Sequence, residues 1–324
     1  MQLLLSHFNI FWLGLALPIL GITVLLATYF LKRVWQKKQF KVSWEAVALI
    51  DRRSQLSYEE FIRDYASVCK PVILTDVIKN WPALTKWTLD FFRSTYGSIN
   101  VTVTDCSEGI RSRNQDITMK LADYLDYLAS HDRQRSLYLE ELRLSSFPEL
   151  RQDYDVPVYF PNWLERLPME LQKKYRLERS TVYIGPKDSS IGLHIDSYDL
   201  PAWVALTSGR KKIIFFSPDQ GDFLYGGEVN AFSPNLNQFP LYAHAKPIEA
   251  VLEPGEVIYI PPRWWHQVKN LEDSISLNTN ILNECNSELA FQSFRDIAPI
   301  KGRLLPLLLE FPWLGNALFR VGLI

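Results

Sequence analysis

The feature that most constrains the fold is a series of short strand-like segments in the second half of the chain. From Thr181 onward, β-branched and aromatic residues occur in short runs separated by Gly, Pro and charged residues. Several short strands at regular spacing predict a sandwich or jelly roll, a mainly β fold whose two sheets enclose a pocket. The predicted strands are Thr181 to Ile184, Leu193 to Asp196, Ala202 to Leu206, Lys211 to Phe216, Ile248 to Leu252, Val257 to Ile260 and Ile275 to Ile281.

The part of the chain that precedes this series mixes helical and strand patterns. Ser57 and Glu60 have the spacing of a capping box, which predicts a helix through about Val68. Thr88 can cap a second helix that ends at Gly97. Helices are also predicted at Thr118 to Ala129 and Asn162 to Tyr175, and strands at Val72 to Leu74, Asn100 to Thr104 and Leu137 to Leu139. We expect these helices to surround the barrel.

Two of the five histidines lie at strand edges beside turns. Side chains alternate faces along a strand, so His194 and Asp196 would aim an imidazole and a carboxylate at one point. His266 follows the strand that Pro261 and Pro262 must end, and it would arrive as a third ligand from elsewhere. Two histidines and one carboxylate leave coordination positions open and are typical of non-haem Fe(II) oxygenases. We therefore predict that these three residues bind the metal and form the catalytic centre.

These stretches resemble a known family. Residues Gly255 to Asn270 are similar to the second cupin motif, in which Gly, Pro, Gly, His and Asn recur at fixed spacing, except that Arg263 replaces a signature glycine. The His-x-Asp pair, in place of the His-x-His of small metal-binding cupins, resembles JmjC and cupin-like oxygenases. This branch contains the asparaginyl hydroxylase of hypoxia-inducible factor. The resemblance extends upstream through residues 71–88 and covers roughly residues 57–295.

The resemblance implies a double-stranded β-helix fold and an Fe(II)- and 2-oxoglutarate-dependent dioxygenase. In this family 2-oxoglutarate takes two iron positions, O2 takes the third, and the distal carboxylate of 2-oxoglutarate needs a cation. The family's Gly-x-Lys pattern assigns that role to Lys211, whereas strand alternation alone does not choose between Lys211 and Lys212. Tyr138 resembles the tyrosine that hydrogen-bonds the same carboxylate. Asn278 resembles an asparagine that lines the metal pocket.

Two departures concern the polar contacts around the co-substrate and the prime substrate. Ile191 stands where the family often has threonine, a role that Ser189 or Ser190 could take, and Leu200 stands where the family has asparagine. The expected reaction is hydroxylation of a protein side chain or a small molecule, with release of succinate and CO2. The sequence does not identify this prime substrate, nor does it separate hydroxylation from demethylation.

Two alternatives to an oxygenase remain open. The first is a catalytically inactive cupin-like binding module, against which the complete ligand set and Lys211 argue. The second is a metal cupin that does not use 2-oxoglutarate. Such cupins usually use three histidines and a glutamate, so Asp196 argues against this reading.

The N-terminal region predicts a membrane anchor. Residues 10–31 carry no charged side chain, and a helix of this length spans the hydrocarbon core of a bilayer, roughly 30 Å. A signal peptide would need a basic segment before a shorter apolar core. A buried helix is the other alternative, because Pro18 and Gly21 interrupt the run. The flanking cations lie between Lys32 and Lys41, so we expect a single-pass protein whose soluble domain faces the cytoplasm.

We predict three parts along the chain: residues 1–41 as the anchor and its basic linker, residues 42–298 as the oxygenase domain, and residues 299–324 as an apolar helical tail. Pro306 and Pro312 would break the tail into pieces too short to span a bilayer. The tail is expected to form a helical cap or a homodimer contact, and docking on the membrane is the alternative.

Composition adds two expectations. The net charge of −1 gives no sign of a nucleic-acid partner. The three cysteines include no Cys-x-x-Cys pair and fit a reducing compartment.

Overall fold

The computed structural model describes residues 24–25, 27–29, 48–107, 116–130, 133–174, 177 and 180–320. The chain divides into two units, Met1–Lys41 and Val42–Ile324. Every strand and helix named below belongs to the second unit. The predicted anchor, residues 10–31, lies almost entirely outside the described residues. Among the helices that are described, none is both long enough and apolar enough to cross a bilayer.

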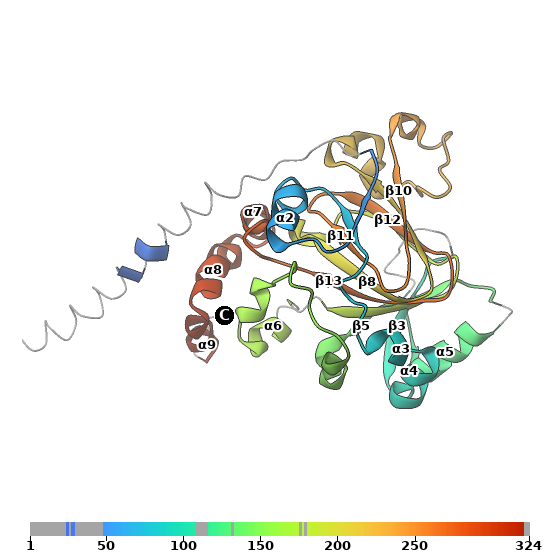
Figure 1. The fold of residues 1–324 in the computed structure, drawn as a ribbon, viewed down its shortest axis with the longest axis horizontal. Coiled ribbons are helices and arrows are strands. Elements are labelled where there is room, and N and C mark those ends of the chain that lie inside the picture. Colours follow the sequence, from blue (N-terminus) through green and yellow to red (C-terminus); the bar gives the residue numbers. More distant parts are fainter. Residues whose placement is uncertain are drawn as a thin grey trace, which may run out of the picture. The chain divides into compact units, whose positions relative to one another are not determined.

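Two sheets form the body of the second unit (Figure 1). The larger sheet has the order β1-β2-β11-β8-β13-β6-β5-β3-β4, and the smaller has the order β10-β9-β12-β7. The strands are β1 (Asp51–Arg53), β2 (Val72–Leu74), β3 (Asn100–Asp105), β4 (Asp116–Lys120), β5 (Leu137–Arg143), β6 (Thr181–Gly185), β7 (Ser190–His194), β8 (Ala202–Ser208), β9 (Lys211–Phe216), β10 (Ile248–Leu252), β11 (Val257–Ile260), β12 (Trp265–Asn270) and β13 (Ser274–Asn280). Leu206 and Ile258 of the larger sheet share one buried cluster with Ile213 and Phe215 of the smaller. This arrangement fits the predicted jelly roll.

Helices surround the sheets, as expected. Figure 1 shows α3, α4 and α5 grouped beside β3, and α8 and α9 beside α6, with α7 next to α2. The α-helices are α2 (Tyr58–Phe61), α3 (Ala83–Lys86), α4 (Leu89–Tyr96), α5 (Leu121–Ala129), α6 (Met169–Lys174), α7 (Ser287–Ile297), α8 (Pro299–Glu310) and α9 (Pro312–Arg320). Shorter turns of helix are η1 (Ile62–Ala66), η3 (Leu144–Ser146), η4 (Pro148–Asp153), η5 (Trp163–Arg166), η6 (Ser197–Asp199), η7 (Pro218–Phe223), η8 (Tyr225–Gly227) and η9 (Pro240–His244).

Both predicted helix caps are present. The Ser57 hydroxyl accepts from the backbone N–H of Glu60, and the Glu60 carboxylate accepts from the N–H of Ser57, which completes the capping box. The Thr88 hydroxyl accepts from the N–H of Phe91 at the start of α4. Gly97 ends that helix, as predicted, and it does so in a right-handed conformation.

Three predicted boundaries are wrong. The helix expected from Thr118 begins at Leu121, because the preceding residues form β4 and pair with β3. The strand expected to reach Asp196 ends at His194, and Asp196 lies in the following turn. Pro306 was expected to break the tail, but α8 runs through it.

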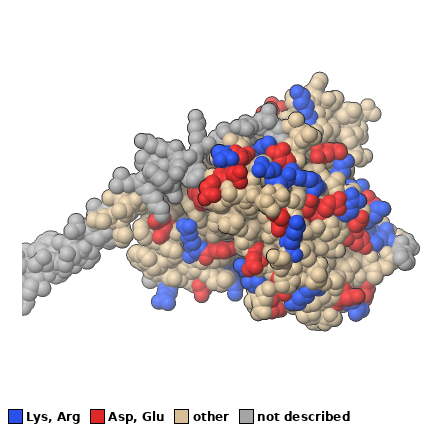
Figure 2. All heavy atoms as spheres, in the orientation of Figure 1, with Lys and Arg blue, Asp and Glu red and all other residues tan. Residues whose placement is uncertain are grey.

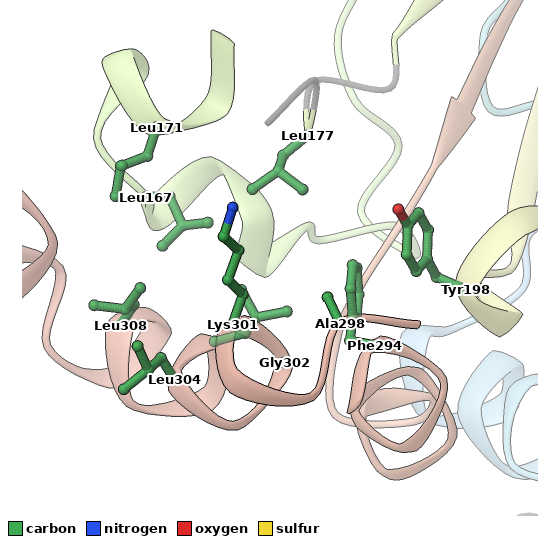
Figure 3. Close-up of a pocket in the computed structure, with 11 residues that line it drawn as sticks. Leu167, Leu171, Leu177, Tyr198, Phe294, Ala298, Lys301, Gly302, Leu304 and Leu308 are labelled. Atoms are coloured by element: carbon green, nitrogen blue, oxygen red, sulfur yellow. The ribbon is translucent and has the colours of Figure 1, made fainter. Parts of the chain in front are cut away.

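The C-terminal helices cover a small apolar cavity. It has a volume of about 140 Å³ and lies between η5 and α6 on one side and α7 and α8 on the other. Figure 3 shows Leu167 and Leu171 facing Leu304 and Leu308 across it. Tyr198, which follows the metal-ligand strand, also lines this cavity.

Charged side chains of both signs are interspersed on the face drawn in Figure 2. On the smaller sheet, Lys212 pairs with Glu249 at 2.8 Å and Lys269 pairs with Asp188 at 2.9 Å. The cations of these pairs lie on β9 and β12, whose opposite faces point into the barrel.

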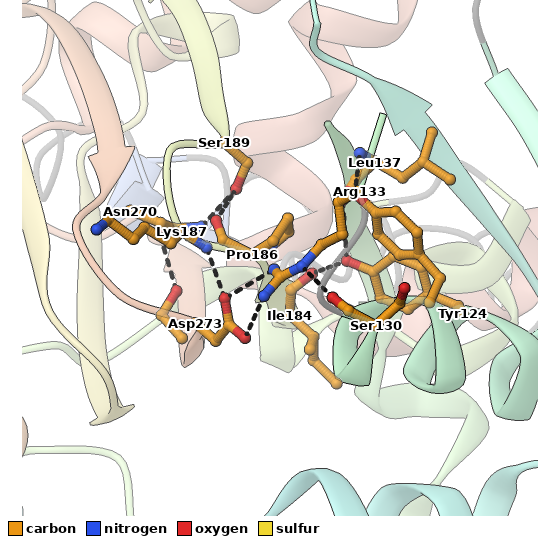
Figure 4. A network of polar contacts seen from close by, with 12 residues as sticks. Tyr124, Ser130, Arg133, Leu137, Ile184, Pro186, Lys187, Ser189, Asn270 and Asp273 are labelled. Carbon is orange, nitrogen blue, oxygen red and sulfur yellow. Dashed lines mark hydrogen bonds and ion pairs between the residues drawn. The ribbon is translucent and has the colours of Figure 1, made fainter. Parts of the chain in front are cut away.

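A buried tyrosine joins β5 to β6 where their ladder is irregular. The register shifts between Leu139 and Leu142. There the Tyr124 hydroxyl donates to the Ile184 carbonyl at 2.6 Å and accepts from the Leu139 N–H at 3.2 Å (Figure 4). Beside it, Asp273 accepts two hydrogen bonds from Arg133, at 2.9 and 3.2 Å. The Tyr124 hydroxyl thus satisfies two backbone groups at the irregular point of the ladder.

We expect Tyr124→Phe to destabilise the fold by about 1–3 kcal/mol, because it leaves a buried carbonyl and a buried N–H without partners. Tyr127→Phe is the matched control. Its hydroxyl bonds the Arg135 carbonyl and the Leu137 N–H at a part-exposed position that water can reach. Urea unfolding of both variants tests this expectation, and an equal loss in the two would contradict it.

Candidate metal centre and co-substrate pocket

Three predicted ligands converge at one point of the barrel. One donor atom from each of His194, Asp196 and His266 lies within 4.8 Å of the other two. The two histidines are directly paired across β7 and β12, and their ring centroids are 4.3 Å apart. Asp196 Oδ1 lies 3.7 Å from His194 Nε2. The convergence therefore arises from one strand pairing and one turn.

Backbone carbonyls fix the orientation of both imidazoles. His194 Nδ1 lies 2.9 Å from the Gly192 carbonyl oxygen, and His266 Nδ1 lies 3.0 Å from the Trp264 carbonyl oxygen. Each Nδ1 must carry the proton to donate to its carbonyl, which leaves each Nε2 with a free lone pair. This is the usual arrangement of histidines that bind a metal through Nε2.

The protonation states of the set also suit a cation. Burial, together with the nearby His194, lowers the pKa of His266 to about 4, so its ring is neutral at pH 7. Asp196 Oδ2 is buried and has no hydrogen-bond partner among the described residues. A buried carboxylate oxygen without a donor is costly unless a cation occupies the space beside it. The donor set of two imidazoles and one carboxylate therefore fits Fe(II).

Lys211 points into the barrel, as predicted, and Lys212 points out. The Lys211 side chain is only 2% exposed, and it follows the inward face of β9 with Ile213 and Phe215. Its ammonium donates to Tyr138 Oη at 3.1 Å and to Asn270 Oδ1 at 2.7 Å. Within the described part of the chain no carboxylate lies within ion-pair distance of Lys211. Burial lowers the pKa of Lys211 to about 7.

Asn270 organises the polar contacts of this lysine. Its Oδ1 accepts from Lys211 and from the Ser274 hydroxyl at 2.8 Å, while its Nδ2 donates to the Ser189 hydroxyl at 2.8 Å. Figure 4 shows Asn270 and Ser189 side by side. Ser190, the other serine considered above, instead accepts from Gln267 Nε2 at 3.0 Å. The sequence alone does not indicate this role for Asn270, although it is the last residue of the cupin motif.

Gly185 is a second residue that the sequence did not reveal. A Cβ added at this position would lie 2.4 Å from the Tyr138 ring and 2.5 Å from Asn270 Nδ2. Only glycine lets the ring of Tyr138 lie this close to β6. No motif marked the position, because the close approach comes from another strand.

Asn278 contacts neither Lys211 nor the ligands in any hydrogen bond of the described residues. It lies beside Tyr183, whose pKa is raised to about 12 by burial first and by nearby Glu140, and which also feels the charge of Asp196. Asn278 Oδ1 is buried without a hydrogen-bond partner among the described residues. The amide oxygen is thus available to a molecule inside the barrel.

The comparisons with known proteins agree with this geometry. The profile of the cupin-like domain family matches residues 58–284. The chain belongs to the cupin-like domain family. The resemblance to JmjC and cupin-like oxygenases is thereby confirmed.

Curated relatives of this cupin-like chain include demethylases and oxygenases. The lysine-specific demethylase JMJ21 of Arabidopsis thaliana is 33% identical over 73% of this chain and 26% of its own length. The 2-oxoglutarate and iron-dependent oxygenase JMJD4 of Gallus gallus is 32% identical over 77% of this chain and 64% of its own length. The arginine-specific demethylase JMJ22 of Arabidopsis thaliana is 30% identical over 76% of this chain and 49% of its own length. The chain thus spans less than two thirds of each of these relatives, and its donor set fits the iron and 2-oxoglutarate in JMJD4's name.

We expect Lys211→Met to stabilise the protein without co-substrate. The lowered pKa means that the folded state binds the Lys211 proton less tightly than the unfolded state. Burying the charged lysine therefore destabilises the folded state by its full amount below about pH 7. This destabilisation shrinks as the pH rises towards the ordinary lysine pKa of about 10.4. Urea unfolding should show a larger gain at pH 6 than at pH 9.

Lys212→Met is the matched control, because its side chain is partly exposed and paired with Glu249. It should show no such gain at either pH. A stabilisation by Lys211→Met that did not depend on pH would contradict the expectation.

Proposed function

We propose that this chain is an Fe(II)- and 2-oxoglutarate-dependent oxygenase. The observation that carries the proposal is the pairing of two features in one barrel. A two-histidine, one-carboxylate set lies on β7, β12 and the turn after β7, and a buried lysine without a carboxylate partner in the described residues lies on the adjacent β9. The first feature suits iron, and the second suits an anionic group that enters from solution.

Each residue has a defined task in this proposal. His194 and His266 would bind the metal through Nε2, and the Asp196 carboxylate would be the negatively charged ligand. Lys211 and Tyr138 would hold the distal carboxylate of 2-oxoglutarate. Once that anion is beside it, the lysine is favoured in its charged form and no longer has the lowered pKa of the buried free side chain. The Asn278 amide would hydrogen-bond a molecule in the metal pocket.

When bound at these residues, Fe(II) and 2-oxoglutarate supply the oxidising chemistry, in which O2 gives one oxygen atom to a substrate C–H bond and the other to 2-oxoglutarate as it forms succinate and CO2. The alternatives are less well supported. An inactive binding module has no need of oriented imidazoles or of an orphaned carboxylate oxygen. A metal cupin without 2-oxoglutarate has no need of a buried, unpaired lysine.

We propose a protein side chain as the prime substrate, with a small molecule as the alternative. The names of the relatives include lysine-specific and arginine-specific demethylases as well as oxygenases. Hydroxylation and demethylation begin with the same insertion of oxygen into a C–H bond. When that carbon is an N-methyl group, the product then loses formaldehyde, so formaldehyde release distinguishes the two outcomes.

We also propose that residues 10–31 anchor the protein in a membrane, with residues 42–298 as the oxygenase domain in the cytoplasm. The sequence supports this through the uncharged run and the cations that follow it. Within the run, residues 24–25 and 27–29 are helical, and the Thr28 hydroxyl donates to the Val24 carbonyl at 2.9 Å. In an apolar environment a polar group must find its hydrogen-bond partner within the protein, and this hydroxyl does so within its own helix.

For the tail, residues 299–324, we propose a homodimer contact, and docking on the membrane remains the alternative. Two large apolar side chains support an outward contact. Ile300 at the start of α8 is 78% exposed, and Trp313 at the start of α9 is 61% exposed.

The activity is tested by 2-oxoglutarate turnover. We expect the full chain to form succinate only with Fe(II), O2 and 2-oxoglutarate, and His194→Ala, Asp196→Ala and His266→Ala each to abolish this turnover while circular dichroism stays unchanged. His244→Ala is the control, because this exposed histidine lies outside the set. Full turnover by His266→Ala would refute the assignment.

The anchor is tested by deleting residues 1–41. We expect the full chain to sediment with membranes and the deleted chain to remain in the supernatant, because the uncharged run is removed. If the oxygenase domain were protected from protease in sealed cytoplasm-out vesicles, the proposed orientation would be wrong.

A further inference from the structure

The metal set contains one ligand that the β-ladder does not hold. His194 and His266 are paired residues of β7 and β12, so their separation is fixed by backbone hydrogen bonds. Asp196 lies beyond the last residue of β7, in the turn that leads into η6. Its carboxylate nevertheless lies within 4.8 Å of both imidazoles. Something other than strand pairing must hold this turn in place.

An ion pair joins this turn to the turn that leads into β12, the strand that carries His266. Arg263 Nη2 lies 3.0 Å from Asp199 Oδ2, and the two side chains are 38% and 18% exposed. Asp199 stands three residues after Asp196, and Arg263 stands three residues before His266. We call this pair the clasp. It links the turn that carries Asp196 to the turn that precedes the strand of His266.

The clasp is formed by residues in a costly backbone conformation. Arg263 has φ 64°, and Asp199 has φ 52°. The left-handed region is unfavourable for an ordinary side chain relative to the right-handed one. Position 263 is also where the cupin motif has glycine, the residue that takes this conformation at no steric cost. The chain therefore has an arginine where glycine would be easier to fold, and its guanidinium reaches the metal-ligand turn.

Each turn is also fixed to the body of the protein on its own side. Tyr198, with φ 62°, stacks on Phe294 of α7 with ring centroids 4.3 Å apart and an interplanar angle of 16° (Figure 3). On the other side, the Trp264 indole donates to the Cys69 carbonyl at 2.7 Å. The clasp connects these two anchored turns to each other.

We propose that Arg263 and Asp199 are positioning residues that hold the Asp196 carboxylate at the correct distance from the two imidazoles. This inference rests on the proposed function, because it assumes that the three side chains bind one metal ion. Neither Asp199 nor Arg263 is one of the three ligands, so the clasp acts through the backbone of the two turns.

The test uses Co(II) as the probe, because it takes the same ligands as Fe(II) and its visible absorption reports coordination geometry. The full chain is titrated with Co(II), alongside Asp199→Asn and Arg263→Gly. We expect Co(II) to bind about 10-fold more weakly in both variants, at the lower end of the loss of 10- to 100-fold that outer contacts of metal ligands produce. We also expect an altered absorption spectrum, because the carboxylate is displaced while the histidines stay.

Asp188→Asn is the matched control. Asp188 also has a positive φ, 68°, and it pairs with Lys269, which lies three residues on the other side of His266. Its ion pair is 2.9 Å long but lies outside the ligand turns. We expect this variant to bind Co(II) with the affinity and spectrum of the unaltered protein.

Folding stability separates positioning from general support of the structure. Arg263→Gly relieves the left-handed strain, and asparagine accepts the conformation of Asp199 well. We therefore expect both variants to unfold in urea at or above the midpoint of the unaltered protein while they bind Co(II) more weakly. Arg263→Lys, which keeps the charge, should restore part of the affinity.

The possible failures are distinct. If the unaltered chain binds no Co(II), the proposed function fails. If it binds Co(II) and the two clasp variants bind with the same affinity and spectrum, the clasp has no positioning role. If the variants lose stability and affinity together, or if Asp188→Asn shows the same loss, the clasp is only structural support and the inference is overturned.

Discussion

The pairing of His194 with His266 across β7 and β12 is the constraint on which the rest of the site depends. These residues are far apart in sequence, and the ladder alone brings their rings to a centroid distance of 4.3 Å. β12 also pairs with β9 on its other side, where Asn270 lies opposite Lys211. One strand thus supplies a metal ligand near its start and the partner of the buried lysine at its end. The metal centre and the co-substrate pocket are two ends of the same element.

Much of this could be predicted from local pattern. Val72–Leu74, Lys211–Phe216, Ile248–Leu252 and Val257–Ile260 form strands with the predicted bounds, because short β-branched runs between turn residues rarely form anything else. Lys211 could be chosen over Lys212 only by resemblance, and in the structure Lys211 lies on the inward face of β9. The wrong predictions concern elements that depend on distant contacts. The end of β4 has a helical pattern and becomes a strand through its pairing with β3. β12 gives no strand signal, because polar residues interrupt its alternation.

The positions that depart from the family pattern have local explanations. Leu200 stands where the family has asparagine, and it is buried in the apolar cluster that joins η5 to the C-terminal helices. Ile191 stands where threonine is frequent, and it pairs with Val268 across the ladder, while Ser189 supplies a hydroxyl to Asn270. Both positions are apolar in this chain, and a serine hydroxyl two residues before Ile191 accepts from Asn270. Neither change could be interpreted from one sequence, because each depends on what lies across the fold.

The strand β12 also sets the distance between the metal ligand His266 and the lysine partner Asn270. His266 and Asn270 lie four residues apart on one face, which corresponds to about 13 Å along an extended strand. Inserting one residue between them would turn one of the two side chains out of the barrel. The spacing between the iron end and the carboxylate end can therefore change only in steps of about 7 Å. Such a step is too coarse to fit a co-substrate that is one carbon longer or shorter. In the proposed oxygenase, selection between dicarboxylates of neighbouring length would therefore depend on side-chain conformations, such as that of Lys211, and not on the strand spacing.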